Sequence, residues 1–428
     1  MDVESLSHLN ETFEQFHAHF APFFGRKQWR ERSRDYLQAL LVQSQERCNA
    51  ENLSEVVDAS ARVLQRFLTE AGWDDDAVTA ALQEYLAPRL AHPQAVWAVD
   101  ESGIVKQGKK SVGVARQYCG AVGKVANCQM GVFLAHVGPR GRAIVDKRLF
   151  LPKEEWTDAP ARCKAAGVPE KALPYQSKAA LALGLLERAQ TWGHLRAEWV
   201  TGDDDYGKSP AFRDGVDALG LLYRLEVPSN TPVWPMDTRL FTPPAPKRGR
   251  PPQPRPEPGQ REEVGERAGA LPSWAWQAIT VAEGVQGPRT YLFAFERRKD
   301  SRDGKPGIEV GVVYRKNLDG SEPRHYFTNA PEDTPPETQA WVAAARWPIE
   351  TEFEANKSHV GLDEYEVRGW QGWNHHITLC LLASAFLLTL QQEWGEKAAP
   401  NHASAGVSGG LRALAAQALD PHRSSRVA

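Results

Sequence analysis

Hydrophobic residues recur every three or four positions through the first part of the chain, which is the spacing of one face of an α-helix. The stretches "RERSRDYLQALLVQSQERCN" and "LSEVVDASARVLQRFLTEAG" both follow this spacing. In "GWDDDAVTAALQEYL", acidic residues precede a third such stretch and are suited to cap its N-terminus. The pattern predicts a helical N-terminal domain over residues 1–92.

From residue 93 the pattern changes to short apolar runs that are typical of buried strands. "AVWAVDES" is one such run and ends in acidic residues, while "NCQMGVFLAHV" and "RAIVDKRLFL" are joined by the turn "GPRGR" and predict a hairpin. A helix over 177–193 then leads into a strand in "AEWVTGDDDYG", a helix in "PAFRDGVDALG" and a strand in "LLYRLEV". Strands followed by helix–strand alternation predict an α/β core with a mixed sheet, whose first part covers 93–235.

Residues 236–333 are predicted to form a β-rich insertion. Its segment 242–263, "TPPAPKRGRPPQPRPEPGQREE", is dominated by proline, arginine and glycine and predicts a disordered linker. Four segments after it, from "WAWQAITVAEG" to "RHYFTNA", alternate apolar with polar residues and predict antiparallel strands.

The second part of the core is predicted over 334–395. "TPPETQAWVAAARWPIETEFEANK" indicates one helix, with Thr334 at its N-cap and Pro335 in its first turn. The apolar run "ITLCLLASAFLLTL" is shorter than the roughly 20 residues that span a bilayer, so we expect a buried core helix and no membrane segment. Residues 396–428 are expected to be a flexible tail with one short helix at "GGLRALAAQAL".

Composition limits the class of protein. A length of 428 residues suggests two or three domains, and a net charge of −3 gives no global sign of nucleic-acid binding. The five cysteines are scattered without a CxxC pair, which predicts reduced thiols of a cytoplasmic protein. The acidic N-terminus lacks the pattern of a secretory signal. Any nucleic-acid function therefore depends on local basic patches.

Three carboxylates are candidates for chemistry. Asp100 and Asp203 each follow a predicted buried strand, and Glu350 lies on a predicted helix. Catalytic groups of open α/β sheets gather at the carboxyl ends of strands, although a single aspartate there is commonly a turn or helix cap. Three carboxylates on rigid elements are suited to two Mg²⁺ ions, which can activate one oxygen and stabilise the leaving oxygen of a phosphodiester.

The sequence resembles bacterial insertion-sequence transposases of the DDE class, in "VDESGIVKQGKKSVGVARQYCGAVGKVANCQ", in "WVTGDDDYG" and in the stretch from "TNAPEDTPP" to "YEVRGW". The resemblance implies a ribonuclease H-like mixed sheet with flanking helices. It also implies that Asp100, Asp203 and Glu350 are the catalytic, metal-binding acids. Asp204 and Asp205 remain alternatives to Asp203, and Glu354 remains an alternative to Glu350.

The family has a longer signature of tyrosine, arginine, glutamate and lysine at fixed spacing. Arg346, Glu350 and Lys357 match it, whereas Ala343 stands where the family has tyrosine. On a single helix, Arg346, Glu350 and Lys357 would share one face, with the two cations extending toward DNA phosphates. The departure at Ala343 concerns the contact that the ring makes to DNA and leaves the metal-binding acids unaffected.

Further basic residues are candidate DNA contacts. Lys106, Lys109, Lys110 and Arg116 follow the first acid and are expected to meet phosphates, with a solvated hairpin as the alternative. Arg248 and Arg250 in "PKRGRPP" resemble a minor-groove hook, with a plain linker as the alternative. Basic residues of the N-terminal domain indicate either a DNA-binding bundle or an ordinary soluble surface: Arg26, Lys27, Arg30, Arg32 and Arg34.

The resemblance implies a cut-and-paste DNA transposase. A homodimer would bind terminal inverted repeats, cleave phosphodiesters with two Mg²⁺ ions (or Mn²⁺ in their place), and join the 3′ ends to target DNA. The second strand would be cut through a hairpin, and the protein would be cytoplasmic and nucleoid-associated. The alternatives are an inactive transposase-derived DNA-binding repressor and a ribonuclease H-like nuclease without strand transfer.

Overall fold

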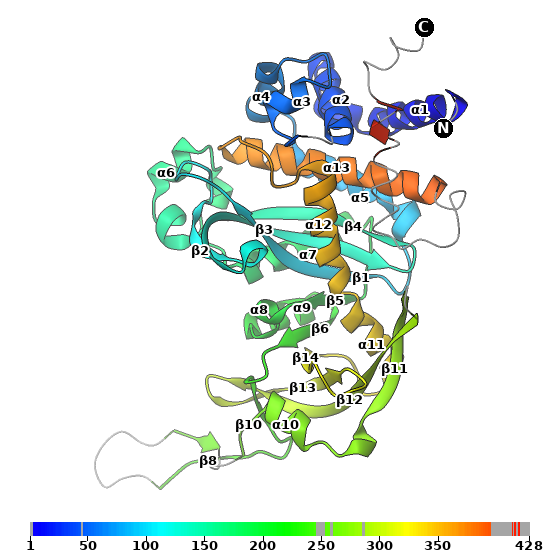
Figure 1. Ribbon diagram of the computed structural model, residues 1–428. Coiled ribbons are helices and arrows are strands. Elements are labelled where there is room, and N and C mark those ends of the chain that lie inside the picture. Colours follow the sequence, from blue (N-terminus) through cyan, green and yellow to red (C-terminus); the bar gives the residue numbers. More distant parts are fainter. Residues whose placement is uncertain are drawn as a thin grey trace. The chain divides into compact units, whose positions relative to one another are not determined.

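The computed structural model describes residues 3–43, 46–244, 253–256, 260–284 and 287–394, and also 413, 415, 416, 418 and 419. They form a mixed α/β structure with a large mixed sheet and flanking helices, as predicted (Figure 1). The chain divides into a first unit, Met1–His92, Asp100–Arg196 and Pro348–Ala428, and a second unit, Pro93–Val99 and Ala197–Trp347. The predicted first part of the core, 93–235, is therefore shared between both units.

The N-terminal part of the first unit is helical, as its periodicity predicts. Its elements are α1 (Val3–Phe20), the 3₁₀ turn η1 (Ala21–Phe24), α2 (Lys27–Val42), α3 (Ala50–Ser54), α4 (Ala61–Thr69) and α5 (Asp75–Leu90). The acidic run before α5 caps this helix, since the Asp74 carboxylate accepts hydrogen bonds from the N–H groups of Asp76 (2.9 Å) and Ala77 (3.3 Å).

The sheet of the first unit contains most of β1 (Val96–Val105), with β2 (Ala115–Cys119), β3 (Lys124–Gly138) and β4 (Gly141–Phe150). Strands β3 and β4 form the predicted antiparallel hairpin. The prediction that the first strand ends at its acidic residues is wrong, because β1 continues through Asp100 to Val105. Beyond the sheet lie a π-helical turn η3 (Lys153–Thr157), α6 (Pro160–Ala165) and α7 (Lys178–Trp192). Ser177 caps α7 at its start, as the predicted helix 177–193 requires.

Helix α13 (Trp370–Trp394) is the buried core helix that the apolar run predicts. It is long and apolar enough to cross a bilayer, yet 89% of its apolar window is buried inside the protein. Trp373 is fully buried, His375 stacks on Trp73 with 3.7 Å between ring centroids, and His376 bonds to the Tyr36 hydroxyl at 2.9 Å. Both histidines are therefore part of the packed interior of the first unit.

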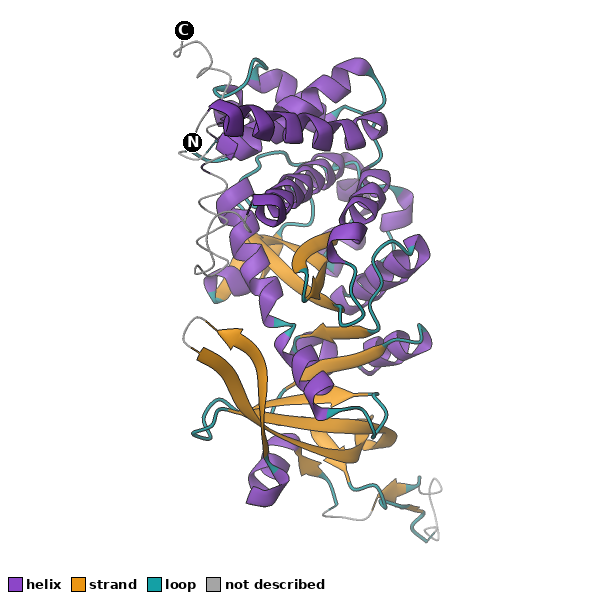
Figure 2. Ribbon diagram, turned by 90° about the vertical axis from the view of Figure 1, so that its right-hand side faces the viewer, coloured by secondary structure: helices purple, strands orange, loops and turns teal. Residues whose placement is uncertain are grey.

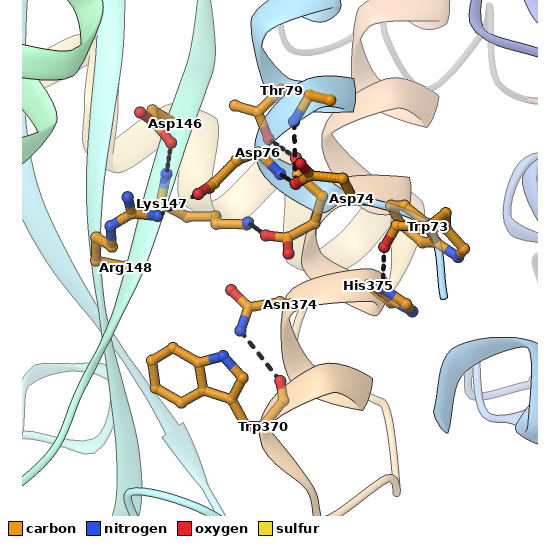
Figure 3. A network of polar contacts seen from close by, with 12 residues as sticks. Trp73, Asp74, Asp76, Thr79, Asp146, Lys147, Arg148, Trp370, Asn374 and His375 are labelled. Atoms are coloured by element: carbon orange, nitrogen blue, oxygen red, sulfur yellow. Dashed lines mark hydrogen bonds and ion pairs between the residues drawn. The ribbon is translucent and has the colours of Figure 1, made fainter. Parts of the chain in front are cut away.

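A network of buried charges joins α5 to the hairpin of the first unit (Figure 3). The fully buried Lys147 ammonium pairs with Asp75, and Arg148 pairs with Asp76 at 3.1 Å, while Arg188 of α7 also pairs with Asp76. Burial raises the pKa of Asp75 and Asp76, but the adjacent cations outweigh it and the net pKa of both carboxyls is lowered. The charged forms are thus the ones that the fold stabilises.

The second unit combines a parallel and an antiparallel part. Strands β5 (Trp199–Gly202) and β6 (Leu222–Val227) run parallel to the first residues of β1, with α8 (Asp204–Gly207) and α9 (Pro210–Ala218) between them. From β6 the order continues through β14 (Arg324–Thr328), β13 (Lys305–Lys316) and β12 (Gly287–Arg302), all antiparallel, and β11 (Gln277–Gly284) pairs with β12 (Figure 2). The predicted antiparallel region is therefore confirmed.

The edge of the second unit includes residues expected to be a linker. Here lie β7 (Pro232–Trp234), β10 (Glu262–Glu263), α10 (Val264–Ala270), and the two-stranded sheet of β8 (Leu240–Phe241) and β9 (Arg255–Pro256). Within segment 242–263, the described residues Arg255–Pro256 and Glu262–Glu263 are in strands, whereas residues 242–244 are in neither a helix nor a strand. Arg248 and Arg250 lie outside the described residues, as does most of 396–428, although the described residues between 413 and 419 are helical.

The single helix predicted from residue 334 is wrong, because two helices occupy this segment. Helix α11 (Pro336–Ala344) begins after Pro335, and α12 (Trp347–Val360) follows a turn at residues 345 and 346. Pro348 explains the break: its ring cannot donate a backbone hydrogen bond and clashes with the carbonyl four residues earlier, which is that of Ala344. Arg346 therefore precedes α12, and the proposed single helical face for Arg346, Glu350 and Lys357 does not exist.

Candidate active site

In the second unit, the register of the parallel strands aligns three residues that each directly precede an acid in the sequence. Val99 of β1 is paired with Gly202 of β5, and Gly202 is paired with Leu225 of β6. The residues that directly follow these three are Asp100, Asp203 and Glu226. Glu226 was missed in the sequence, although it carries the same signal as Asp203, an acid near the end of an apolar strand. Only the pairing of β5 with β6 in the folded protein shows that Glu226 lies beside Asp203.

Asp203 is held at the start of α8. Its carboxylate accepts a hydrogen bond from the N–H of Asp205 at 3.0 Å and caps this short helix. Gly207 ends the helix against β6, where a Cβ atom would lie 1.8 Å from the carbonyl oxygen of Glu226. Glycine at this position lets α8 lie against β6, and this contact fixes the acidic turn beside Glu226.

A pocket of about 460 Å³ opens beside this turn, within the second unit. Its lining residues are Asp203, Asp204, Glu226, Val227, Pro228, Ser229, Pro323, Arg324, His325 and Arg346. Asp205, by contrast, is exposed and pairs with Lys208. Of the three adjacent aspartates, Asp203 and Asp204 therefore face the pocket, and Asp205 is the weakest alternative.

Two arginines share one carboxylate in this pocket. Glu226 Oε1 accepts a hydrogen bond from Arg324 Nη1 at 2.8 Å, and Glu226 Oε2 lies 3.4 Å from Arg346 Nε. Glu226 raises the pKa of the Arg324 guanidinium. Burial lowers the pKa of His325 in the same pocket, so the imidazole is neutral at pH 7. Arg346, the predicted DNA contact, is thus positioned next to Asp203 in the second unit.

Asp100 lies inside strand β1 of the first unit. Its carboxylate accepts a hydrogen bond from the N–H of Glu101 at 2.7 Å, and only 8% of the residue is exposed. The neighbouring Glu101 side chain pairs with Lys178 of α7. Asp100 is therefore a nearly buried carboxylate on a regular strand, which is a more rigid setting than the strand end predicted for it.

Helix α12 of the first unit carries Glu350 in its first turn. Lys357 Nζ lies 3.5 Å from the carbonyl oxygen of Gly103 on β1, so this face of α12 is directed at β1. Glu352 points elsewhere and pairs with Arg142 at 2.7 Å, whereas Glu354 is exposed. Glu350 and Lys357 are seven residues apart and share a face, and Glu354 remains the alternative acid.

The three predicted acids do not all belong to one unit. Asp100 and Glu350 are in the first unit and Asp203 is in the second. Across the described parts of the chain, no three His, Cys, Asp or Glu side chains form a group that could hold a metal ion. The donor chemistry nevertheless suits a hard cation, because all three side chains are carboxylates on regular elements or at their ends. Their convergence stays a prediction.

The predicted basic contacts differ in their surroundings. Lys106 Nζ donates to the carbonyl oxygen of Tyr365 at 2.7 Å and lies 3.5 Å from the centre of that ring, and burial lowers the pKa of its ammonium to about 8. These contacts give Lys106 a structural role. Lys109, Lys110 and Arg116 are exposed, as phosphate contacts require.

The basic residues of helix α2 and its approach are largely engaged within the N-terminal helices. Arg34 Nε donates to Glu14 at 2.8 Å, and Arg32 Nη1 donates to Asp35 at 2.6 Å. The remaining three have local contacts too: Lys27 with Glu31, Arg30 with the Gly25 carbonyl, and Arg26 over the Trp29 ring. This arrangement favours the soluble-surface interpretation over a DNA-binding face.

Comparison with known proteins assigns the chain to a family. A family profile described as DDE superfamily endonuclease matches residues 19–288. The probable transposase for insertion sequence element IS701 of Microchaete diplosiphon is 28% identical over 173 residues, 39% of this chain and 40% of that protein. The match thus spans less than half of this relative.

Two solved structures are similar at low identity. One, a piggyBac transposase synaptic complex with hairpin DNA, is 10% identical with a TM-score of 0.44, and the match covers 96% of this chain and 80% of that chain. The NurA nuclease from Sulfolobus solfataricus is 9% identical with a TM-score of 0.24, and the match covers 72% and 86%.

Proposed function

Because the chain belongs to the DDE superfamily endonucleases, we propose that it is a transposase that cuts DNA at the ends of a mobile element and joins the freed 3′ ends to target DNA. The observation that carries the proposal is the strand register. Val99 and Gly202 are paired on adjacent parallel strands, and the two predicted catalytic aspartates, Asp100 and Asp203, directly follow them. The parallel pairing of β1 with β5 ends at Val99 and Gly202, and ligands of open α/β sheets bind beside the ends of parallel strands.

Asp100, Asp203 and Glu350 are the residues that would hold the divalent cations, two Mg²⁺ ions with Mn²⁺ able to replace them. Bound there, the ions would polarise a phosphodiester and stabilise the charge on its oxygens. Spacing supports the inclusion of Glu350. Seven residues of helix from Lys357 back to Glu350 rise about 10 Å, and three residues of strand from Gly103 back to Asp100 span about 10 Å. The contact between Lys357 and Gly103 thus ties the helix that carries Glu350 to the strand that carries Asp100.

The cations around the acids would position DNA. Arg346 lines the pocket with Asp203, and Lys357 lies on the face of α12 that carries Glu350. The exposed Lys109, Lys110 and Arg116 would extend the phosphate-binding surface of the first unit, and Arg248 and Arg250 would reach the minor groove. Such contacts orient the scissile bond without forming any covalent intermediate with the protein.

The DNA partners are terminal inverted repeats and target DNA, bound by a homodimer in the bacterial nucleoid. A relative described as a probable transposase of an insertion sequence supports this assignment. Cutting of the second strand through a DNA hairpin belongs to the same proposal. Product mapping on denaturing gels checks it, since open double-strand ends alone would exclude the hairpin route.

The decisive experiment compares two adjacent aspartates. Purified full-length protein is incubated with Mg²⁺ and a supercoiled plasmid carrying the DNA that flanks the reading frame. We expect nicking and strand transfer by the wild type, loss of both in Asp203→Asn, and nearly normal activity in Asp205→Asn, because Asp205 pairs with Lys208 away from the pocket. DNA binding without nicking by the wild type would instead identify a repressor, and nicking without strand transfer a nuclease.

A further inference from the structure

We propose that Arg324 and Arg346, bridged by Glu226, form a subsite for one DNA phosphodiester beside Asp203, with Glu226 as its positioning residue. The subsite deepens the proposed function, on which the identity of the ligand as DNA rests. It lies entirely in the second unit, and it adds two residues, Arg324 and Glu226, to the predicted contact Arg346.

Glu226 is built to hold both guanidinium groups at once. Its side chain is only 12% exposed, and its two oxygens face different arginines, Oε1 toward Arg324 at 2.8 Å and Oε2 toward Arg346 at 3.4 Å. The Arg324 side chain is 51% exposed, so this guanidinium reaches solvent at the pocket while it is tethered to Glu226. Charged hydrogen bonds of this kind fix orientation as well as adding energy.

The charge of the cluster fits a phosphodiester. Two guanidinium groups would repel each other, and the shared carboxylate offsets one of their charges and leaves a net charge of about +1 for a ligand of about −1. The neighbouring His325 adds no charge at pH 7, because burial keeps its imidazole neutral. The two arginines are suited to bind a phosphate, because the paired N–H donors of a planar guanidinium group match the spacing of phosphate oxygens.

The subsite is tied to the acidic turn by the backbone. Gly207 at the end of α8 lies against the carbonyl of Glu226, and Asp203 caps the start of the same four-residue helix. The position of Glu226, and through it that of both arginines, is thus set relative to Asp203 by main-chain contacts. A phosphate bound by the arginines would lie in the pocket that Asp203 lines.

The same unit offers a matched control. Glu296 is 16% exposed and also pairs with two arginines, Arg267 at 3.1 Å and Arg298 at 3.2 Å. None of these three residues lines the pocket beside Asp203. Glu296→Gln therefore removes a comparable bridging carboxylate without touching the subsite.

The test measures binding of the full-length protein to a fluorescein-labelled DNA duplex of roughly 30 base pairs and arbitrary sequence, in EDTA, from about 50 to 200 mM salt. Arg324→Gln is expected to weaken binding several-fold and to reduce the slope of log K against log salt by about 1, as the loss of one phosphate contact requires. Glu296→Gln is expected to bind like the wild type. An unchanged slope and affinity in Arg324→Gln would overturn the subsite.

Glu226→Gln separates positioning from simple charge. If Glu226 only repels phosphate, its removal should strengthen DNA binding. If Glu226 positions the arginines, Glu226→Gln is expected to weaken DNA binding several-fold. In that case, adding Arg324→Gln to Glu226→Gln should weaken binding less than Arg324→Gln does in the wild type. Stronger binding by Glu226→Gln would refute the positioning role. Thermal unfolding of Glu226→Gln and Glu296→Gln controls for general destabilisation.

The endonuclease proposal and the subsite proposal can be refuted independently of each other. Because the binding assay contains no divalent cation, a wild type that binds DNA but never nicks it would refute the endonuclease proposal and leave the arginine result decisive. Normal nicking with wild-type binding in Arg324→Gln would refute the subsite alone. A wild type that does not bind DNA would refute both.

Discussion

Arg224 places a positive charge in the interior of the protein without a hydrogen-bonding partner among the described residues. The residue is fully buried in β6, and none of its three guanidinium nitrogens has a hydrogen-bond partner among the described residues. The guanidinium lies 5.0 Å from the ring centre of Tyr326 and 5.8 Å from that of Phe293, and burial lowers its pKa to about 9. Aromatic faces offset part of the cost of desolvating a cation but supply no hydrogen bonds.

Replacing Arg224 by methionine is expected to stabilise the protein. Arg224→Met removes an unpaired buried charge while keeping most of the side-chain volume, so we expect the free energy of unfolding to rise by about 1–4 kcal/mol in urea titrations. Arg213→Met is the matched control, because Arg213 is equally buried but paired with Asp300 at 2.5 Å. That variant should lose stability, and a loss in Arg224→Met as well would show that the cation supports the core.

Of the acids in the pocket of the second unit, the amino-acid sequence alone predicts Asp203 but not Glu226. Asp203 was found because an aspartate that directly follows an apolar strand is conspicuous in "WVTGDDDYG". Glu226 was overlooked in "LLYRLEV" because a glutamate inside a strand is ordinary until the register puts it beside Asp203. Pairing between strands is long-range information, and no local pattern of residues encodes it.

Among the elements, α12 has the contacts that decide which acid it presents. Glu352 is bound to Arg142 of β4 and Lys357 to the Gly103 carbonyl of β1, so the rotation of the helix about its axis is fixed on two sides. Glu350 shares the face of Lys357, whereas Glu354 is exposed. The helix therefore favours Glu350 as the third acid.

Glu350→Gln is expected to lower the nicking rate by at least about 100-fold while changing the DNA dissociation constant less than about threefold, since a metal-binding carboxylate contributes to chemistry more than to binding. Glu354→Gln should nick at nearly the wild-type rate. Plasmid nicking and fluorescence anisotropy on the same preparations measure both quantities. The reverse pattern, a silent Glu350→Gln and an inactive Glu354→Gln, would transfer the role to Glu354.

Elements with strong local signals were predictable, and those decided by tertiary context were not. Alternation of apolar and polar residues predicted β11 to β14, and acidic residues suited to an N-cap predicted the start of α5. Strand β1 was predicted to end at its acidic residues, yet its neighbour β3 keeps these residues in the sheet. The break before α12 had a local signal in Pro348 that the periodic pattern on both sides concealed.

At the scale of the molecule, buried histidines make stability depend on pH. Burial lowers the pKa of His17, His136 and His375 to about 4, and that of His376 to about 3. The ordinary pKa of histidine in an unfolded chain is 6.5, so below pH 6.5 the unfolded state binds protons that the folded state does not bind. All four lie in the first unit, which is therefore the more acid-sensitive part.

Stability is accordingly expected to fall as pH decreases from 6.5 to 4, with each of these histidines contributing up to about 1.4 kcal/mol per pH unit. Below about pH 4 the decline should continue, because Asp75 and Asp76 have lowered pKa values and their contribution is lost as they become protonated. Urea unfolding across this range gives the slope. His375→Gln should reduce the slope of the unfolding free energy against pH by the contribution of one proton, about 1.4 kcal/mol per pH unit. An unfolding free energy that does not change between pH 6.5 and 5 would contradict the assignment of neutral buried histidines.

The boundaries of the two units also determine how the gene can be divided. The polypeptide passes from one unit to the other four times, at residues 92/93, 99/100, 196/197 and 347/348. Neither unit is a contiguous stretch, so no deletion from the ends of the reading frame can separate one unit from the other. Transfer of either unit to another protein would therefore require at least two separated segments of the gene to be joined.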